Sequence, residues 1–274
     1  MQKYNVAIAM SVYKLDKCRY VKLAIDSLLN QTYKNIHIFI EVDGLVSKSL
    51  KDLLSTYKEK DNISLNFNSQ CKGLATRLNS IIDKVIIADK YDFIARMDAD
   101  DISSPERIET QLLFLLKNSE ISVVGSDMIE ISELGVELFY KKMSATHDEL
   151  LANIIKRCPL NHPSVMFRAD VFTSPNLRYK SELMNTQDYY LWIDLLAAGK
   201  KFANINQPLL YFRVNDQFHS RRGFKKAVND FKSRIYAFRH LKVLSVGNLV
   251  HTVLLFLLRI APKSIKVKAY SYFR

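Results

Sequence analysis

The first hundred residues alternate short apolar runs with segments in which apolar residues recur three and four positions apart. This alternation predicts strands at Val6–Ser11, Ile36–Val42, Ile63–Phe67 and Phe93–Met97, and helices at Tyr20–Asn30, Ser47–Tyr57 and Leu74–Ile87. Strands that alternate with helices form a mainly parallel sheet covered by helices on both faces. Such sheets bind ligands at the carboxyl ends of their strands, so the residues just after each strand deserve most weight.

The remainder of the chain mixes both periodicities. A helix is expected to start at Pro105, with Ser104 as its cap, and to end near Lys117. Gly135 marks a turn within β-structure, and Gly199 is expected to end a helix. The other predicted elements are strands at Ile121–Gly125, Val165–Arg168 and Leu209–Arg213, β-structure over Met128–Met143, and helices at His147–Lys156 and Tyr189–Ala198.

Composition narrows the classes of protein. Hydrophobic residues make up 48% of the 274 residues, which is enough for a sizeable core and argues against global disorder. The three cysteines lie far apart, so a zinc site and a disulfide framework are both disfavoured and reduced thiols are expected. The apolar run Val6–Met10 is too short for a signal peptide, and we therefore expect a cytoplasmic protein.

Three acids follow the predicted strand that ends at Met97: Asp98, Asp100 and Asp101. Carboxylates this close repel one another unless a cation offsets their charge. Mg²⁺ and Mn²⁺ prefer oxygen ligands and commonly bind one or two carboxylates together with substrate phosphates. The pattern predicts a metal site at this acidic cluster, and the alternative is a solvated acidic turn before the next helix.

Several short motifs follow one another in a specific order. They are Ser11-Val12-Tyr13, Glu41-Val42-Asp43-Gly44, Lys72-Gly73-Leu74-Ala75 with Asn79, Arg96-Met97-Asp98-Ala99-Asp100-Asp101 with Pro105, Arg107 and Gln111, His162-Pro163-Ser164-Val165-Met166, and Gln187-Asp188-Tyr189-Tyr190-Leu191-Trp192. In this order and spacing the chain resembles the family-2 glycosyltransferases of the GT-A fold, especially bacterial enzymes of O-antigen and exopolysaccharide synthesis. The resemblance covers most of residues 4–215.

The resemblance implies a role for individual residues. Asp43 is expected to bind the base of a nucleotide sugar, usually uracil, and Asp98 to lie near the ribose and donor sugar. Asp100 is expected to bind the metal, and Asp188 to deprotonate the acceptor hydroxyl in a single, inverting displacement. The further expected donor residues are Ser11, Tyr13, Glu41, Gly73, Arg77 and Ala99, and the expected acceptor residues are His162, Gln187 and Trp192.

Other interpretations of these residues stay open. Gln187 stands where the family commonly has an acid, and Glu41 where many relatives have an aspartate. Asp188 by itself could be an acid favoured by a helix N-terminus. His162 could be structural, and Trp192 could belong to the core.

The net charge of +12 belongs entirely to the end of the chain. Residues 219–274 hold 13 Lys and Arg and one acid, Asp230, whereas residues 1–218 hold 27 of each sign. The charge-free run Val243–Leu258 is short for a spanning helix, but as a helix it separates Ser245, Asn248, Thr252 and Arg259 from an apolar face. With Tyr270, Tyr272 and Phe273 beyond it, this pattern favours a helix in the interface of an anionic membrane. Packing on the catalytic domain and dimerisation are the alternatives, and nucleic acid is not expected.

We therefore expect a catalytic domain over residues 1–218, with a nucleotide-sugar half to about residue 127 and an acceptor half after it, and a basic amphipathic tail over 219–274. The expected activity is metal-dependent inverting transfer of a hexose or N-acetylhexosamine from a UDP-sugar, with Mn²⁺ or Mg²⁺, to a lipid-linked oligosaccharide at the inner membrane face. The alternatives are an inactive nucleotide-sugar-binding protein and a nucleotidyltransferase. The second is disfavoured because Ser11–Arg19 holds no glycine for a triphosphate loop.

Overall fold

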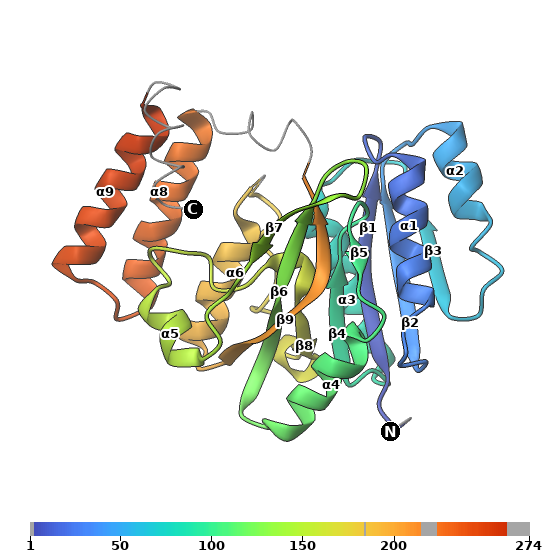
Figure 1. The fold of residues 1–274 in the computed structure, drawn as a ribbon, viewed down its shortest axis with the longest axis horizontal. Helices are drawn as coiled ribbons and strands as arrows, with labels where there is room; N and C mark the ends of the chain where they lie inside the picture. Colours follow the sequence, from blue (N-terminus) through green and yellow to red (C-terminus); the bar gives the residue numbers. More distant parts are fainter. Residues whose placement is uncertain (1–2, 184, 215–223, 262–274) are drawn as a thin grey trace.

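The computed structural model describes residues 3–183, 185–214 and 224–261, and its strands form one sheet (Figure 1). Within that part of the chain the strand order is β3-β2-β1-β4-β8-β6-β9-β5, and β7 pairs with β6. The pairs β1–β2, β1–β4, β2–β3 and β6–β9 are parallel, and the shorter ladders are antiparallel. The predicted mixed, mainly parallel sheet is confirmed. The strands are β1 (Val6–Tyr13), β2 (Ile36–Asp43), β3 (Ile63–Phe67), β4 (Phe93–Met97), β5 (Ile102–Ser103), β6 (Ile121–Ile131), β7 (Glu137–Lys141), β8 (Met166–Arg168) and β9 (Lys201–Arg213).

Helices cover both faces of the sheet because successive strand residues point to opposite sides. In β1, Ile8 and Met10 pack with α1 and α4, whereas Ala7 and Ala9 pack with α3 and α6. The helices are α1 (Cys18–Leu29), α2 (Lys48–Ser55), α3 (Leu74–Ala88), α4 (Arg107–Lys117), α5 (His147–Ala152), α6 (Gln187–Ala197), α8 (Phe224–His240) and α9 (Val246–Ile260), with 3-10 turns at His162–Ser164 and Ala169–Phe172.

The start of α4 differs from the prediction. The helix begins at Arg107, and Ser104 does not cap it. The reason is tertiary: Ser103 lies in β5, and the backbone N–H of Ser104 donates to the carbonyl of Leu209 on β9, 3.0 Å away. Pro105 therefore belongs to a turn that leads from β5 into the helix.

The last strand is longer than predicted. Only Leu209–Arg213 was expected, but β9 starts at Lys201 and pairs with β6 along its whole length. The register shifts where Ser126 pairs with Ile205 and Asp127 with Pro208, so Asn206 and Gln207 form an irregularity. Two polar residues before Pro208 do not follow a strand pattern in the sequence, and the strand here forms only because β9 pairs with β6, which is distant in sequence.

Both glycine turns are confirmed. Gly135 has a φ of 86° between β6 and β7, and Gly199 has a φ of 76° just after α6. This left-handed backbone is available to glycine at little cost. The boundary expected near residue 127 falls inside β6, so the nucleotide-sugar and acceptor halves share one strand and one sheet.

The tail forms two helices that lie side by side at one end of the molecule (Figure 1). α8 packs against α6 and contributes Ala237 to a cluster with Tyr189 and Ile193, and α9 packs against α8. The predicted tail helix is α9, which Ser245 caps through a hydrogen bond to the N–H of Asn248. None of the helices in the described ranges has the length and apolar character needed to cross a membrane. Tyr270, Tyr272 and Phe273 lie outside the described residues.

Candidate active site

The carboxyl ends of β1, β2 and β4 meet at one edge of the sheet, as the alternation of elements predicts. Tyr13 at the end of β1 pairs with Asp43 at the end of β2, and Ser11 pairs with Glu41. Met97, the last residue of β4, pairs with Met10 on the other side of β1. Asp43 and the acids after Met97 therefore follow strands on either side of β1. Tertiary structure brings together residues that are more than fifty positions apart in sequence.

Asp43 is the centre of a dense hydrogen-bond network. Its Oδ1 accepts from the N–H of Lys72 at 2.8 Å and from Arg77 Nε at 2.7 Å. Its Oδ2 accepts from the N–H of Gly73 at 2.9 Å and from Cys71 Sγ at 3.1 Å. Burial alone would raise the pKa of Asp43, but these hydrogen bonds lower it below its ordinary value. The carboxylate is thus held ionised and rigid next to the predicted donor residues Gly73 and Arg77.

Glu41 has structural partners on every side. The side chain is 2% exposed, forms an ion pair with Lys84, and accepts hydrogen bonds from Asn66 and Asn68 at 2.8 and 2.7 Å. These bonds join β2 to β3 and α3. The expected contact of Glu41 with the nucleotide stays a prediction, and its surroundings favour a supporting role.

Asp98, Asp100 and Asp101 form the acidic cluster that the sequence predicts. Their ligand atoms all lie within 4.8 Å of one another, close enough to hold one ion. Burial and the charge of Asp98 raise the pKa of Asp100 to about 6. Burial and the charges of Asp98 and Asp100 raise the pKa of Asp101 well above its ordinary value. Asp100 and Asp101 thus resist ionisation, and a divalent cation bound by the cluster would relieve the repulsion among the carboxylates. Ala99, between the first two acids, is buried.

A fourth acid faces this cluster. Asp16 follows β1 and accepts a hydrogen bond from the N–H of Tyr13 at 2.8 Å. Burial, together with the charges of Asp100 and Asp98, raises the pKa of Asp16 to about 7 despite that bond. Pattern analysis missed Asp16, because an isolated acid in a short loop has no sequence signature.

Two buried guanidinium groups balance the acids. Arg96 is 2% exposed and forms an ion pair with Asp98. Arg213, at the end of β9, donates from Nε to the carbonyl of Asp100 at 2.9 Å, and its N–H donates to Asp101 Oδ1 at 2.9 Å. Arg213 also donates to the carbonyls of Ser132 and Glu133 at 3.0 and 3.1 Å. It therefore fixes the acidic loop against the β6–β7 hairpin.

Asp188 lies in the first turn of α6, on the side of the sheet that α3 also covers. The charges of Asp188 and of Asp98 in the acidic cluster both act on the hydroxyl of Tyr179. Burial raises the pKa of Tyr179, the charge of Arg96 opposes that rise, and the charges of Asp188 and Asp98 add to it. Because both carboxylates act on one buried hydroxyl, the expected base and the expected donor residue lie around the same side chain.

The expected acceptor residues differ in exposure. Gln187 is partly exposed at the first position of α6. His162 Nε2 hydrogen-bonds the Tyr179 hydroxyl at 2.8 Å, and burial together with Arg96 holds the pKa of His162 well below its ordinary value, so the ring is neutral at pH 7. Trp192 has no exposed surface and stacks on Phe167 at 5.8 Å between ring centroids, which corrects the expected acceptor contact in favour of core packing.

Arg213, Asp16 and Tyr179 are the residues of this site that pattern analysis missed. Each reaches the cluster through tertiary structure alone. Arg213 had one usable signal, because it ends a predicted strand and the carboxyl edge of the sheet is where ligands bind.

A comparison with protein families decides the class. The family model described as "Glycosyl transferase family 2" matches residues 8–169, more than half of the chain. The chain belongs to glycosyl transferase family 2. The match includes most of β1, all of β2 to β4, the Asp43 network and the acidic cluster, whereas the motif from Gln187 to Trp192 lies beyond it.

Similar proteins add context to this family membership. The Escherichia coli "O-antigen biosynthesis glycosyltransferase WbnJ" is 31% identical over 85% of this chain and 87% of its own. The Escherichia coli "UDP-Gal:alpha-D-GlcNAc-diphosphoundecaprenol beta-1,3-galactosyltransferase" is 24% identical over 96% of this chain and 94% of its own. The solved mannosyltransferase PcManGT from Pyrobaculum calidifontis, in complex with GDP-Man and Mn²⁺, has a TM-score of 0.66 at 10% identity, covering 98% of this chain and 80% of that one. The fold of this family-2 glycosyltransferase is GT-A.

Proposed function

We propose that this family-2 glycosyltransferase transfers a hexose or N-acetylhexosamine from a UDP-sugar to an acceptor hydroxyl, with inversion at the anomeric carbon. The observation that carries the proposal is the carboxyl edge of the sheet, where the Asp43 network at the end of β2 and the acidic cluster after β4 lie on either side of β1. Asp43 would lie next to the uracil, and its four hydrogen bonds would fix Arg77 and the loop from Cys71 to Gly73 beside the base. Ser11, Tyr13, Gly73, Arg77, Asp98 and Ala99 would line the rest of the donor site.

A divalent metal fits the acidic cluster. Burial and repulsion between the acids raise the pKa values of Asp100 and Asp101 although Arg96 and Arg213 are close, so a bound cation would stabilise the ionised carboxylates. Asp100 would hold the ion with help from Asp98, and Mn²⁺ or Mg²⁺ would neutralise the charge on the departing diphosphate. Asp101 is fully buried and bound by Arg213, so we assign it to supporting the loop.

Asp188 would supply the base. Its carboxylate would accept the proton of the acceptor hydroxyl as that oxygen attacks the anomeric carbon and the bond from that carbon to the diphosphate breaks. UDP leaves with the bonding electrons, and the new bond forms on the opposite face. Gln187 and His162 would orient the acceptor as neutral hydrogen-bonding groups.

The acceptor we propose is a lipid-linked oligosaccharide at the cytoplasmic face of the cell membrane. Two relatives support this choice through their names, one an O-antigen enzyme and the other acting on a sugar diphosphoundecaprenol. The product would belong to a surface polysaccharide. In this proposal the donor half would extend to about residue 127, within β6, and the acceptor half would include α6 with Asp188.

A panel of UDP-sugars, each with and without Mn²⁺ and Mg²⁺, tests the proposal. One donor should raise the melting temperature in a metal-dependent way and release UDP, because a ligand that binds only the folded protein stabilises it. Asp100→Ala should abolish both effects, whereas the control Asp52→Ala on exposed α2 should keep them. Binding without UDP release from any donor, with lipid-linked acceptors present, would favour the inactive binding protein. Pyrophosphate release from a nucleoside triphosphate and a sugar phosphate would favour the nucleotidyltransferase.

A further inference from the structure

Helix α9 is amphipathic, and its apolar side faces outward. Seven aliphatic side chains are between 46% and 82% exposed: Val246, Leu249, Val250, Val253, Leu254, Leu257 and Ile260. Their spacing of three and four residues places them in one stripe along the helix. We call these seven residues the outer face of α9. A helix at the surface of a globular protein ordinarily turns such a stripe toward the core.

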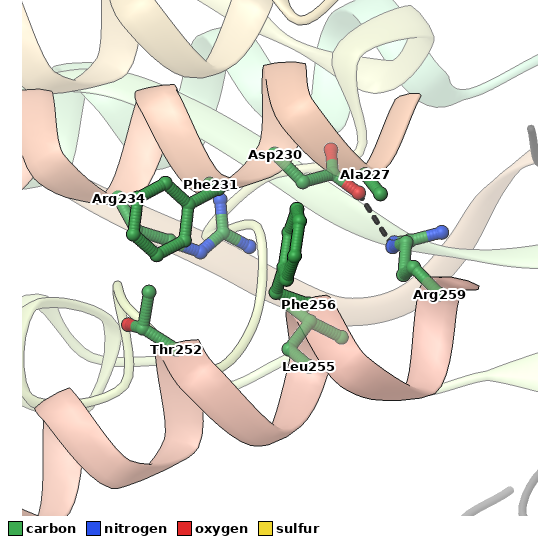
Figure 2. Close-up of a pocket in the computed structure, with 8 residues that line it drawn as sticks. All are labelled: Ala227, Asp230, Phe231, Arg234, Thr252, Leu255, Phe256 and Arg259. Atoms are coloured by element: carbon green, nitrogen blue, oxygen red, sulfur yellow. Dashed lines mark ion pairs between the residues drawn. The ribbon is translucent and has the colours of Figure 1, made fainter. Parts of the chain in front are cut away.

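The inner side of α9 holds the polar residues and explains this orientation. Thr252 is 1% exposed, and Arg259 Nε lies 2.6 Å from Asp230 Oδ2 on α8. Figure 2 shows both side chains directed toward α8, with the Phe256 ring between them and the Phe231 ring of α8 above Thr252. The centroids of the two rings are 5.5 Å apart. The ion pair and the buried threonine determine which side of α9 meets α8. The exposure of the outer face is therefore a built feature of the α8–α9 pair.

The segment that presents the outer face carries a large excess of positive charge. Lys232, Arg239 and Lys242 are exposed on α8 and in the turn that leads to α9. Asp230 is the single acid of residues 219–274, and Arg259 already pairs with it. The sequence after α9 continues with Lys263, Lys266, Lys268 and Arg274 and contains no acid. An apolar stripe in a positively charged segment is complementary to an anionic lipid bilayer, whose hydrocarbon core is apolar and whose head groups are negatively charged.

We propose that the outer face of α9 inserts into the interface of an anionic lipid bilayer. The helix has 15 residues, or about 22 Å, which is shorter than the roughly 30 Å of a hydrocarbon core. It therefore lies along the membrane surface with its stripe immersed. A second copy of this chain fits the face less well, because a symmetric contact would bring two cationic surfaces together.

This surface connects to the candidate active site through α8. The Tyr236 hydroxyl on α8 donates to Asp194 Oδ1 on α6 at 2.6 Å, and Ala237 packs with Tyr189 and Ile193 of α6. Asp188 lies in the first turn of that same helix. Membrane binding through α9 would thus hold the acceptor half of the enzyme at the bilayer, where a lipid-linked acceptor resides. This last step rests on the proposed function, whereas the lipid binding itself does not.

Substitutions on the outer face test the proposal in the full-length protein. Flotation with vesicles of phosphatidylglycerol and phosphatidylethanolamine should recover the native protein at about 50 mM salt, and less of it at about 500 mM. The double variant Leu254→Asp with Leu257→Asp should reduce the partition coefficient roughly 10-fold or more at both salt concentrations. Ile87→Asp is the matched control, because Ile87 is 83% exposed on α3, and it should bind like the native protein.

A charge variant separates the two contributions. Replacing Lys232, Arg239 and Lys242 with glutamine should weaken binding at low salt, with little effect at high salt, where screening already removes the attraction. All these side chains are exposed, so circular dichroism should show an unchanged fold for every variant.

Three results would overturn or separate the proposals. The lipid proposal fails if the native protein ignores anionic vesicles at low salt, or if the double aspartate variant binds them normally. It also fails if sedimentation shows a dimer that the double variant dissociates and that vesicles do not compete with. Turnover of a UDP-sugar with a soluble acceptor should persist in the double variant. If the native protein and the variants bind vesicles as expected but none of them turns over a UDP-sugar, the proposed function is refuted and the proposal of lipid binding is retained.

Discussion

Replacing Asp100 with asparagine should stabilise the metal-free protein while abolishing its activity. In the folded state, burial and the charge of Asp98 raise the pKa of Asp100 from 3.8 to about 6. At 1.36 kcal/mol for each pH unit, ionising Asp100 in the folded protein costs about 3 kcal/mol at neutral pH. Asparagine keeps the size of the side chain and removes the charge. We expect a gain of about 1–3 kcal/mol, or roughly 3–10 °C in melting temperature.

The pH dependence gives this prediction its sign. A carboxyl group with a raised pKa binds its proton more tightly in the folded state, so it favours folding at low pH and loses that advantage as the pH rises through the folded pKa. The advantage of Asp100→Asn should therefore be complete above about pH 7 and about half as large at pH 5. Thermal melts in a chelator at pH 5 and pH 8 measure both values, with Asp52→Asn on exposed α2 as the control.

Added Mn²⁺ should reverse the ranking. The native protein should gain stability from the metal, and the gain should be larger at pH 8 than at pH 5, because the metal competes with protons for the carboxylates. Asp100→Asn should gain little. A folded Asp100→Asn protein that is no more stable than the native one at pH 8 in chelator would refute the desolvation argument. Equal stabilisation of both proteins by Mn²⁺ would refute Asp100 as the ligand.

Three other substitutions or modifications probe the rest of the site. Asp188→Asn should lower the transfer rate roughly 10²–10⁴-fold with UDP affinity nearly unchanged in titrations, and an equal loss of UDP affinity would make Asp188 structural. Cys71 is exposed, and its thiol donates a hydrogen bond to Asp43, which raises the pKa of the thiol. Alkylation of Cys71 should therefore be slow, and bound UDP should slow it further. If mass spectrometry shows no protection by UDP, the nucleotide does not bind next to Asp43. Arg213→Lys should lower Mn²⁺ affinity roughly 10-fold or more, because lysine cannot reproduce the hydrogen bonds to Asp100 and to the β6–β7 hairpin. Unchanged metal binding in the folded variant would make Arg213 a packing residue.

Local patterns in the sequence determined the elements and the position of the acidic cluster. β3 and β4 have the predicted bounds, because a short strand between turn residues is a local signal, whether the strand is buried throughout like β4 or largely exposed at the sheet edge like β3. The carboxyl edge of a parallel sheet follows from chain direction, so Asp43 and Asp98 could be expected at the same edge. The charge of the tail and the two sides of α9 were likewise visible in the sequence.

Tertiary structure alone decided how those pieces act together. Ser104 lost its capping role because its N–H pairs with β9, and the first half of β9 was hidden because its pairing with β6 is long-range. Arg213 reaches Asp100 across 113 residues, a contact that no local pattern encodes. Sequence periodicity could separate the polar and apolar sides of α9 but not say which one faces the protein. That depended on Asp230 on α8, which pairs with Arg259 and leaves the apolar side exposed to solvent.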